Sequence, residues 1–198
     1  MITELFTSDE NRKYLTAAEQ DAFLEAVRQL ERAEIRTLCM TLAYTGCRIT
    51  EALELSASRV DLSAKAITFR TLKQREKTRY RTVPVPDGHL EALELVHRIR
   101  KAQKTKDQGA SALLWPWGRT QATKHVKAAM ALAGIEGAHA TPKGLRHGFG
   151  VRMALKTRNP RLVQKWLGHT KLETTAIYMD LVGEEERAEA VNAWGTRP

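Results

Sequence analysis

Four helix-boundary signals follow one another in the last third of the chain and constrain it to a succession of short helices. Thr141-Pro142 and Asn159-Pro160 each place a capping residue before a proline at the first helical position. Gly168 is a typical helix end, and Thr170 with Glu173 has the spacing of a capping box. The pattern predicts three successive helices, the last of which carries Tyr178.

The rest of the chain is predicted to be helical around one small sheet. A capping box of Thr16 and Glu19 indicates a helix that runs to about residue 30. A second helix is expected near 35–44, closed by Gly46, and a third, short helix begins at Arg48. Residues 66–69 and 82–85 are strand-like and enclose a basic turn, which favours an antiparallel pair. Further helices are expected at 87–100 and 120–132, with a polar loop at 101–110. The expected fold class is therefore mainly α with a small antiparallel β-sheet.

Length indicates one domain, and the charge suits either a nucleic-acid binder or an ordinary basic soluble protein. The 198 residues suffice for a single core at 15–182, with a polar arm at 1–14 and a tail at 183–198. There are 32 Lys and Arg against 23 Asp and Glu, a formal net charge of +9, which is typical of proteins that bind nucleic acid. No apolar run approaches the roughly 18 residues of a membrane span, and no signal peptide is recognisable, so a cytoplasmic protein is expected.

The two cysteines, Cys39 and Cys47, lie among apolar residues and are expected to be buried reduced thiols. They form no C-x-x-C pair, and no histidine lies at zinc-ligand spacing. The sequence therefore predicts no metal site.

Four side chains suit the cleavage of a phosphodiester. Arg48 and Arg146 carry permanent charges that fork onto phosphate oxygens, and Tyr178 can be a covalent nucleophile. His169, nine residues before Tyr178, could help to deprotonate the phenol or donate a hydrogen bond to the phosphate. Taken singly, each has an ordinary structural interpretation, as a surface charge, a helix cap or a packed ring. Their joint order and local sequences carry the functional interpretation.

Those local sequences are Gly46-Cys47-Arg48-Ile49-Thr50-Glu51-Ala52-Leu53, Thr141-Pro142-Lys143-Gly144-Leu145-Arg146-His147 and Leu167-Gly168-His169, with Tyr178 downstream. Over about residues 14–182 the chain resembles the tyrosine recombinase (phage integrase) family, which implies that family's catalytic-domain fold. The resemblance implies catalytic roles for Arg48, Lys143, Arg146, His169 and Tyr178. It also implies a general-acid lysine on the hairpin, Lys73 or alternatively Lys77. The residues expected to contact DNA are Arg75, Lys77, Arg79, Arg119 and Thr120.

The resemblance further implies site-specific recombination of double-stranded DNA. The chain would cut and rejoin strands through a 3′-phosphotyrosine intermediate, in integration, excision, inversion or resolution, and without a metal or nucleotide cofactor. The implied partners are DNA, further protomers in a tetrameric synapse and an accessory DNA-bending protein. The apolar stripe of residues 182–194 would dock on a neighbouring protomer or fold back on its own core.

Two departures from the family pattern leave alternatives open. Lys143 stands where the family most often has histidine, and lysine, which titrates near pH 10.4, cannot serve as the same base at neutral pH. Larger members have an additional N-terminal helical domain, and because this sequence starts close to the catalytic domain, we expect either a chain of the short fimbrial-switch type or a fragment. The alternatives are a DNA-binding regulator of this fold with weak or lost cleavage, a type IB topoisomerase, and a basic helical domain with a coincidental motif.

Overall fold

The computed structural model describes residues 5, 6, 8, 11–71, 79–105, 108–178 and 190–191. Within these ranges the chain forms nine α-helices, two 3-10 helices and three strands. The α-helices are α1 Ala17–Arg28, α2 Ala33–Thr45, α3 Ile49–Leu53, α4 Asp87–His97, α5 Ile99–Lys104, α6 Arg119–Leu132, α7 Pro142–Thr157, α8 Pro160–Leu167 and α9 Glu173–Ala176. The 3-10 helices are η2 Ala57–Arg59 and η3 Gln108–Ser111, and the strands are β1 Val60–Asp61, β2 Ala66–Thr71 and β3 Arg79–Pro84.

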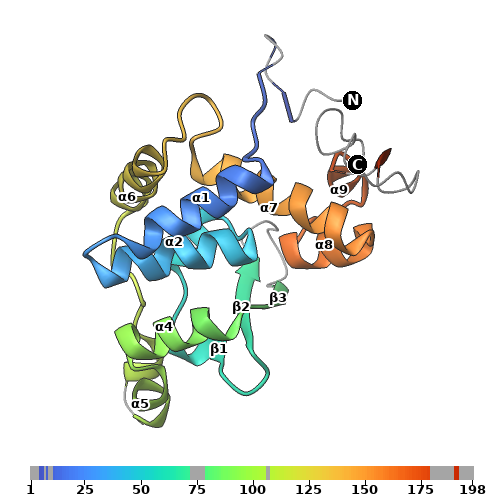
Figure 1. Ribbon diagram of the computed structural model, residues 1–198. Helices are drawn as coiled ribbons and strands as arrows, with labels where there is room; N and C mark the ends of the chain where they lie inside the picture. The colour runs from blue at the N-terminus through green and yellow to red at the C-terminus, as the bar shows by residue number, and fades with distance from the viewer. Residues whose placement is uncertain are drawn as a thin grey trace.

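Helix α7 lies at the centre of the helical part and packs against α1, α2, α6 and α8 (Figure 1). Eight of its residues, from Gly144 to Val151, are buried in succession, which is possible only because helices cover it on several sides. The main core includes Leu38, Leu42 and Leu145. A second, smaller core beside α7 and α8 contains Phe149 and Tyr178 as well as Leu5 and Tyr14 from the start of the chain.

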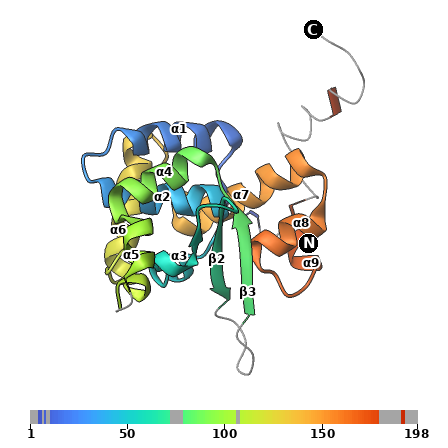
Figure 2. The same ribbon diagram turned by 90° about the horizontal axis from the view of Figure 1, so that it is seen from below.

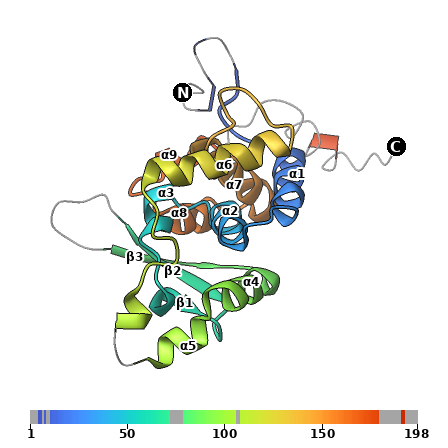
Figure 3. The ribbon, with the colours of Figure 1, turned by 90° about the vertical axis from the view of Figure 1, so that its left-hand side faces the viewer.

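The sheet lies on one side of the helical layer together with α4 and α5 (Figure 3). Its order is β1-β2-β3, and both pairings are antiparallel, with Ile67 opposite Val83 and Phe69 opposite Arg81. β2 and β3 run between α3 and α8 (Figure 2). Both strands flank residues 72–78, and the side-chain alternation of β3 turns Arg81 inward. The predicted fold class is confirmed.

Most of the predicted helix signals form as expected. Thr16 and Glu19 make a reciprocal capping box, and the side chains of Thr141 and Asn159 accept hydrogen bonds from the amides of Gly144 and Leu162. Gly46 ends α2 and Gly168 ends α8 in the left-handed region, at φ values of 58° and 68°. These caps satisfy backbone groups that a helix end leaves unpaired.

Two local predictions were wrong. The predicted helix at 87–100 is broken at Arg98, which is left-handed, and α5 then occupies the start of the predicted loop because Ile99 is fully buried. The predicted capping box at Thr170 does not start α9. Leu172 is the N-cap there, and its hydrocarbon side chain cannot cap the helix, while its carbonyl oxygen accepts from the amides of Thr175 and Ala176.

Cys39 and Cys47 are both buried free thiols, as predicted. Burial raises the pKa of each thiol to about 12, so both stay protonated and unreactive. In the described part of the chain, every helix is too short or too polar to cross a membrane.

Candidate active site

Arg48 is held at a tight junction between α2 and α3. Gly46 adopts a positive φ, and a Cβ atom added to it would lie 2.4 Å from Cδ1 of Phe149, so both backbone and space require glycine. Arg48 is the N-cap of α3. Its amide donates to Oε2 of Glu51 at 2.7 Å, and its Nη1 donates to Oε1 at 2.9 Å. The Arg48 guanidinium is therefore oriented by a carboxylate three residues along the chain.

Glu51 is itself fixed by Arg81 of β3. Nη2 and Nη1 of Arg81 donate to the two carboxylate oxygens at 2.6 and 3.1 Å, and both side chains are almost fully buried. Burial would raise the pKa of Glu51, but the hydrogen bonds and charge of Arg81 lower it below its ordinary value. Sequence reasoning missed both residues. The available signals were the place of Glu51 inside the Arg48 motif and a charged residue, Arg81, at an inward-facing strand position.

Arg146 projects from α7 and is 7% exposed. Its Nη1 donates to the carbonyl oxygen of Gly46 at 2.6 Å and its Nη2 to that of Leu167 at 2.8 Å, so the ends of α2 and α8 both position it. Burial first, and then the nearby charge of Arg48, lowers the pKa of Arg146 to about 10. The group is still charged at neutral pH. Two like charges held close together indicate a site for an anion.

His169 follows Gly168 directly, in the turn after α8. Its Nδ1 lies 3.0 Å from Oγ1 of Thr175, and its ring stacks on that of Tyr178 with centroids 6.1 Å apart and planes at 22°. Burial first, and then Arg146 and Arg48, lowers the pKa of His169 to about 3. The imidazole is consequently neutral at physiological pH and can donate a hydrogen bond without carrying charge.

Tyr178 is 1% exposed and lies just beyond α9. Its ring packs closely against the backbone of α7, where a Cβ atom added to Gly150 would lie 2.7 Å from two ring carbons. Its hydroxyl lies 3.0 Å from Nδ1 of His147, the residue after Arg146. His147 was quoted in the arginine motif but was not selected as a site residue. The signal for it in the sequence was its place directly after Arg146, where the family that the chain resembles usually has histidine.

One cleft, of about 850 Å³, brings five of the predicted catalytic residues together. They are Arg48, Lys143, Arg146, His169 and Tyr178. Lys13, Arg119 and Lys127 add positive charge to its lining, and Thr123 adds a hydroxyl. Of the two predicted contacts on α6, Arg119 lines the cleft, whereas Thr120 is exposed and does not.

The predicted hairpin residues are only partly visible. Lys73, Arg75 and Lys77 lie outside the described residues. Arg79 begins β3, is exposed, and lines a small hollow of about 210 Å³ that His169 also borders. The start of β3 is therefore next to the cleft, on the side where the turn after α8 lies.

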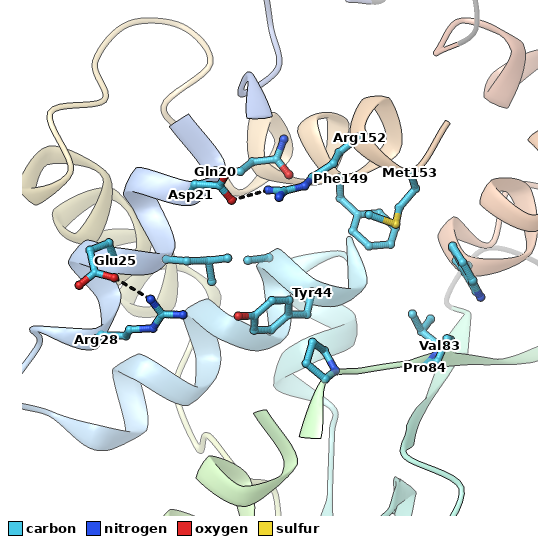
Figure 4. A pocket seen from close by; sticks show the side chains of 14 residues that line it. Gln20, Asp21, Glu25, Arg28, Tyr44, Val83, Pro84, Phe149, Arg152 and Met153 are labelled. Carbon is cyan, nitrogen blue, oxygen red and sulfur yellow. Dashed lines mark hydrogen bonds and ion pairs between the residues drawn. The ribbon is translucent and has the colours of Figure 1, made fainter. Parts of the chain in front are cut away.

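A separate apolar groove of about 590 Å³ lies between α1, α2, β3 and α7 (Figure 4). Its lining includes Tyr44, Pro84, Phe149 and Met153. Ion pairs of 2.6 Å cross its edge from Arg152 to Asp21 and from Arg28 to Glu25. It contains none of the predicted catalytic residues.

The model of the phage integrase family matches residues 13–185. The chain belongs to the phage integrase family. Among curated integrase relatives, the chain is 26% identical over 194 residues to tyrosine recombinase XerD of Bradyrhizobium diazoefficiens, covering 87% of this chain and 60% of that protein. It is 30% identical over 171 residues to type 1 fimbriae regulatory protein FimE of Escherichia coli K12, covering 84% of this chain and 85% of FimE.

Solved integrase-family structures have the same fold. The crystal structure of XerA recombinase superposes with a TM-score of 0.74 at 26% identity, covering 93% of this chain and 66% of that one. The XerH site-specific recombinase bound to a palindromic difH substrate, a post-cleavage complex, gives 0.74 at 25% identity, covering 96% and 56%. The chain spans 60% of the XerD relative, 49% of a XerC relative from Psychromonas ingrahamii and 56% of XerH. The fold is thus that of a tyrosine recombinase catalytic domain.

Proposed function

We propose that this integrase-family chain is a site-specific recombinase that cuts and rejoins double-stranded DNA through a 3′-phosphotyrosine intermediate. The observation that carries the proposal is the pair of crowded guanidinium groups, Arg48 and Arg146, in the same cleft as Tyr178. The positive charge of Arg48 disfavours the cationic form of Arg146, and an anion bound between the two groups would offset that repulsion. A phosphodiester is that anion, and the neighbouring phenol is the nucleophile it would meet.

The reaction consists of two successive transesterifications. The Tyr178 oxygen attacks the phosphorus, and negative charge grows on the two non-bridging oxygens, where Arg48 and Arg146 stabilise it. His169, held neutral, donates a further hydrogen bond to the phosphate, and Lys143 adds a positive charge. Lys73, or alternatively Lys77, protonates the leaving 5′ oxygen. In the second step a 5′ hydroxyl of a partner strand attacks the phosphotyrosine and releases the enzyme. The catalytic groups named here need neither a metal nor a nucleotide.

Double-stranded DNA is the proposed substrate, and the lining of the cleft supports it. Lys13, Arg119 and Lys127 surround the cleft with positive charge that would pair with phosphates flanking the scissile one. Arg75, Lys77 and Arg79 of the hairpin, and Thr120, are the further proposed contacts. A related structure, XerH, is described as bound to its difH substrate after cleavage.

Recombination joins two duplexes, so the proposed active unit is a tetramer on paired sites, with an accessory DNA-bending protein as a further partner. Residues 15–182 would form the catalytic domain, 1–14 an arm, and 183–198 a tail that contacts a neighbouring protomer. The protein would act in the cytoplasm. No observation on the described residues favours the regulator or the topoisomerase over the recombinase.

The test is to capture the DNA that the protein holds covalently in cells. Cells that express the protein are lysed rapidly in denaturant, protein-linked DNA is purified, and the linked strands are sequenced. A recombinase gives discrete, recurrent cleavage positions, and pairs of such positions joined in new combinations. Scattered cleavage without recombinant junctions would indicate a topoisomerase, and recovery of no linked DNA would indicate a binding protein without cleavage.

A further inference from the structure

The hydroxyl of Tyr178 has a hydrogen-bond partner that the established motif does not assign to it. Nδ1 of His147 lies 3.0 Å from that oxygen, and both residues are buried. The two residues lie 31 positions apart in the chain, and their rings approach with centroids 5.9 Å apart. A nitrogen base at hydrogen-bond distance is the first geometric requirement for removing a proton from a nucleophile.

His169 is oriented for another task. Its Nδ1 is engaged by Thr175, and its ring lies nearly parallel to the phenol ring, 22° from it. A ring stacked on the face of the phenol does not direct its nitrogens at the phenol oxygen, which lies in the plane of that ring. His169 is therefore placed to serve the phosphate rather than the phenol proton.

Lys143 and His147 lie four residues apart on α7, so they are neighbours on one face of the helix. Lys143 occupies the motif position where a histidine base would stand, and an ammonium group cannot accept a proton. His147 supplies an imidazole one turn further along that face. His147, unlike Lys143, therefore offers a neutral nitrogen at hydrogen-bond distance from the Tyr178 hydroxyl.

We propose that His147 accepts the proton of Tyr178 during strand cleavage and returns it during rejoining. As the bond from the Tyr178 oxygen to phosphorus forms, the phenol proton moves to Nδ1 of His147. The bond from phosphorus to the 5′ oxygen breaks, and the hairpin lysine protonates that oxygen. On rejoining, the departing Tyr178 oxygen takes its proton back from His147. This inference rests on Tyr178 being the nucleophile of the proposed function.

The surroundings of His147 suit this role. Burial first, and then the charges of Lys143, Arg146 and Lys13, lowers the pKa of His147 to about 4, so the imidazole is unprotonated at physiological pH. His169, also neutral, and Tyr178 itself are the other titratable groups at the ring. A bound phosphate would offset the same cations, which raises the affinity of His147 for a proton when DNA is present. Its Nε2 is buried and has no hydrogen-bond partner among the described residues.

The experiment measures single-turnover formation of the covalent adduct on a nicked suicide substrate carrying the cognate site. His147→Ala and His147→Asn should slow adduct formation by roughly 10² to 10⁴-fold, the usual contribution of a positioned base. Binding of the same DNA should change by only a few-fold. His89→Ala is the matched control, because His89 is a buried histidine that also contacts one hydroxyl, that of Thr41 at 3.0 Å, outside the cleft.

A fluorinated tyrosine incorporated at position 178 separates proton transfer from packing. Fluorine lowers the pKa of the phenol, so less help from a base is needed. With 3,5-difluorotyrosine at position 178, the His147→Ala variant should regain most of its lost rate of adduct formation. In the protein that keeps His147, the same fluorination should change this rate little. Because His147→Asn retains polar atoms near the position of Nδ1, it replaces His147→Ala in this comparison if the alanine variant does not fold.

Three outcomes would overturn the proposal. They are adduct formation at the parental rate in both His147 variants, faster cleavage in them, and a slow rate that fluorination does not improve. Failure of the proposed function is a different result, in which Tyr178→Phe still forms an adduct. If Tyr178→Phe abolishes the adduct while both His147 variants cleave normally, the nucleophile stands and only the role of His147 is refuted.

Discussion

Arg81 donates hydrogen bonds to both carboxylate oxygens of Glu51, at 3.1 and 2.6 Å, in the interior of the protein. The same guanidinium donates from Nε to the carbonyl oxygen of Trp166 at 2.7 Å. Arg81 also lies close to Gly168, since a Cβ atom added to that glycine would lie 2.9 Å from Cδ of Arg81. Strand β3, helix α3 and the end of α8 therefore meet on one side chain. Since Glu51 also orients Arg48, a single buried ion pair connects the predicted hairpin to the proposed phosphate clamp.

Removal of the Glu51 charge should destabilise the protein strongly. Glu51→Gln leaves the Arg81 guanidinium buried without a counter-charge, and loss of one partner of such a pair costs roughly 3–5 kcal/mol. The free energy of unfolding, measured by urea denaturation, reports this loss. Glu25→Gln is the control, since its pair with Arg28 is exposed and should contribute little. Equal stability of the two variants would mean that the buried pair does not hold these elements together.

Arg48→Lys and Arg146→Lys should impair chemistry far more than binding. Lysine keeps the charge but loses the fork that meets two oxygens of one phosphate. Adduct formation should fall by roughly 10²-fold or more, the scale of a lost transition-state donor, while binding of the site changes little. Arg28→Lys, at the separate groove, serves as the control. Parallel loss of binding and cleavage in folded protein would refute the clamp.

The general acid can be identified with a sulfur-substituted substrate. A 5′-bridging sulfur leaves without a proton, so a variant that lacks only the acid should cleave this substrate well and normal DNA poorly. Lys73→Ala is expected to behave in this way, and Lys77→Ala to cleave both substrates. The reverse pattern would assign the acid to Lys77, and failure of both variants on both substrates would place no acid on the hairpin.

The tail prediction concerns assembly. Truncation after Val182 should leave folding and binding to a single site intact but remove cooperative binding to paired sites and strand exchange. Gel-shift titrations and recombination assays with the truncated and full chains measure these effects, and thermal unfolding controls for the fold. A truncated chain that recombines normally would show that residues 183–198 have no role in assembly, and one that no longer folds would show that they belong to the core of their own protomer.

Local signals predicted much of this fold because they act over a few residues. The cap at Thr141 and the left-handed glycines Gly46 and Gly168 determine helix ends by themselves, and the structure has them where expected. The break at Arg98 was not predictable in this way. It depends on burial of Ile99, which brings α5 onto the core and is a property of the tertiary structure.

The residues of the candidate site likewise fall into those that local motifs predict and those that depend on the tertiary structure. Arg48, Arg146, His169 and Tyr178 were selected from sequence because their motifs are compact, and they line one cleft. Their supporting residues could not be selected. Arg81 reaches Glu51 across 30 positions and His147 reaches Tyr178 across 31, and such pairs exist only once β3 and α7 have docked.

The nucleophile is the central claim, and mapping of the covalent adduct tests it most directly. The protein is incubated with a nicked cognate site, denatured, digested with protease, and the DNA-linked peptide is sequenced by mass spectrometry. The peptide should carry the DNA on Tyr178, and Tyr178→Phe should form no adduct, since it keeps the ring and lacks only the attacking oxygen. An adduct on Tyr14, Tyr44 or Tyr80, or one that survives in Tyr178→Phe, would contradict the account.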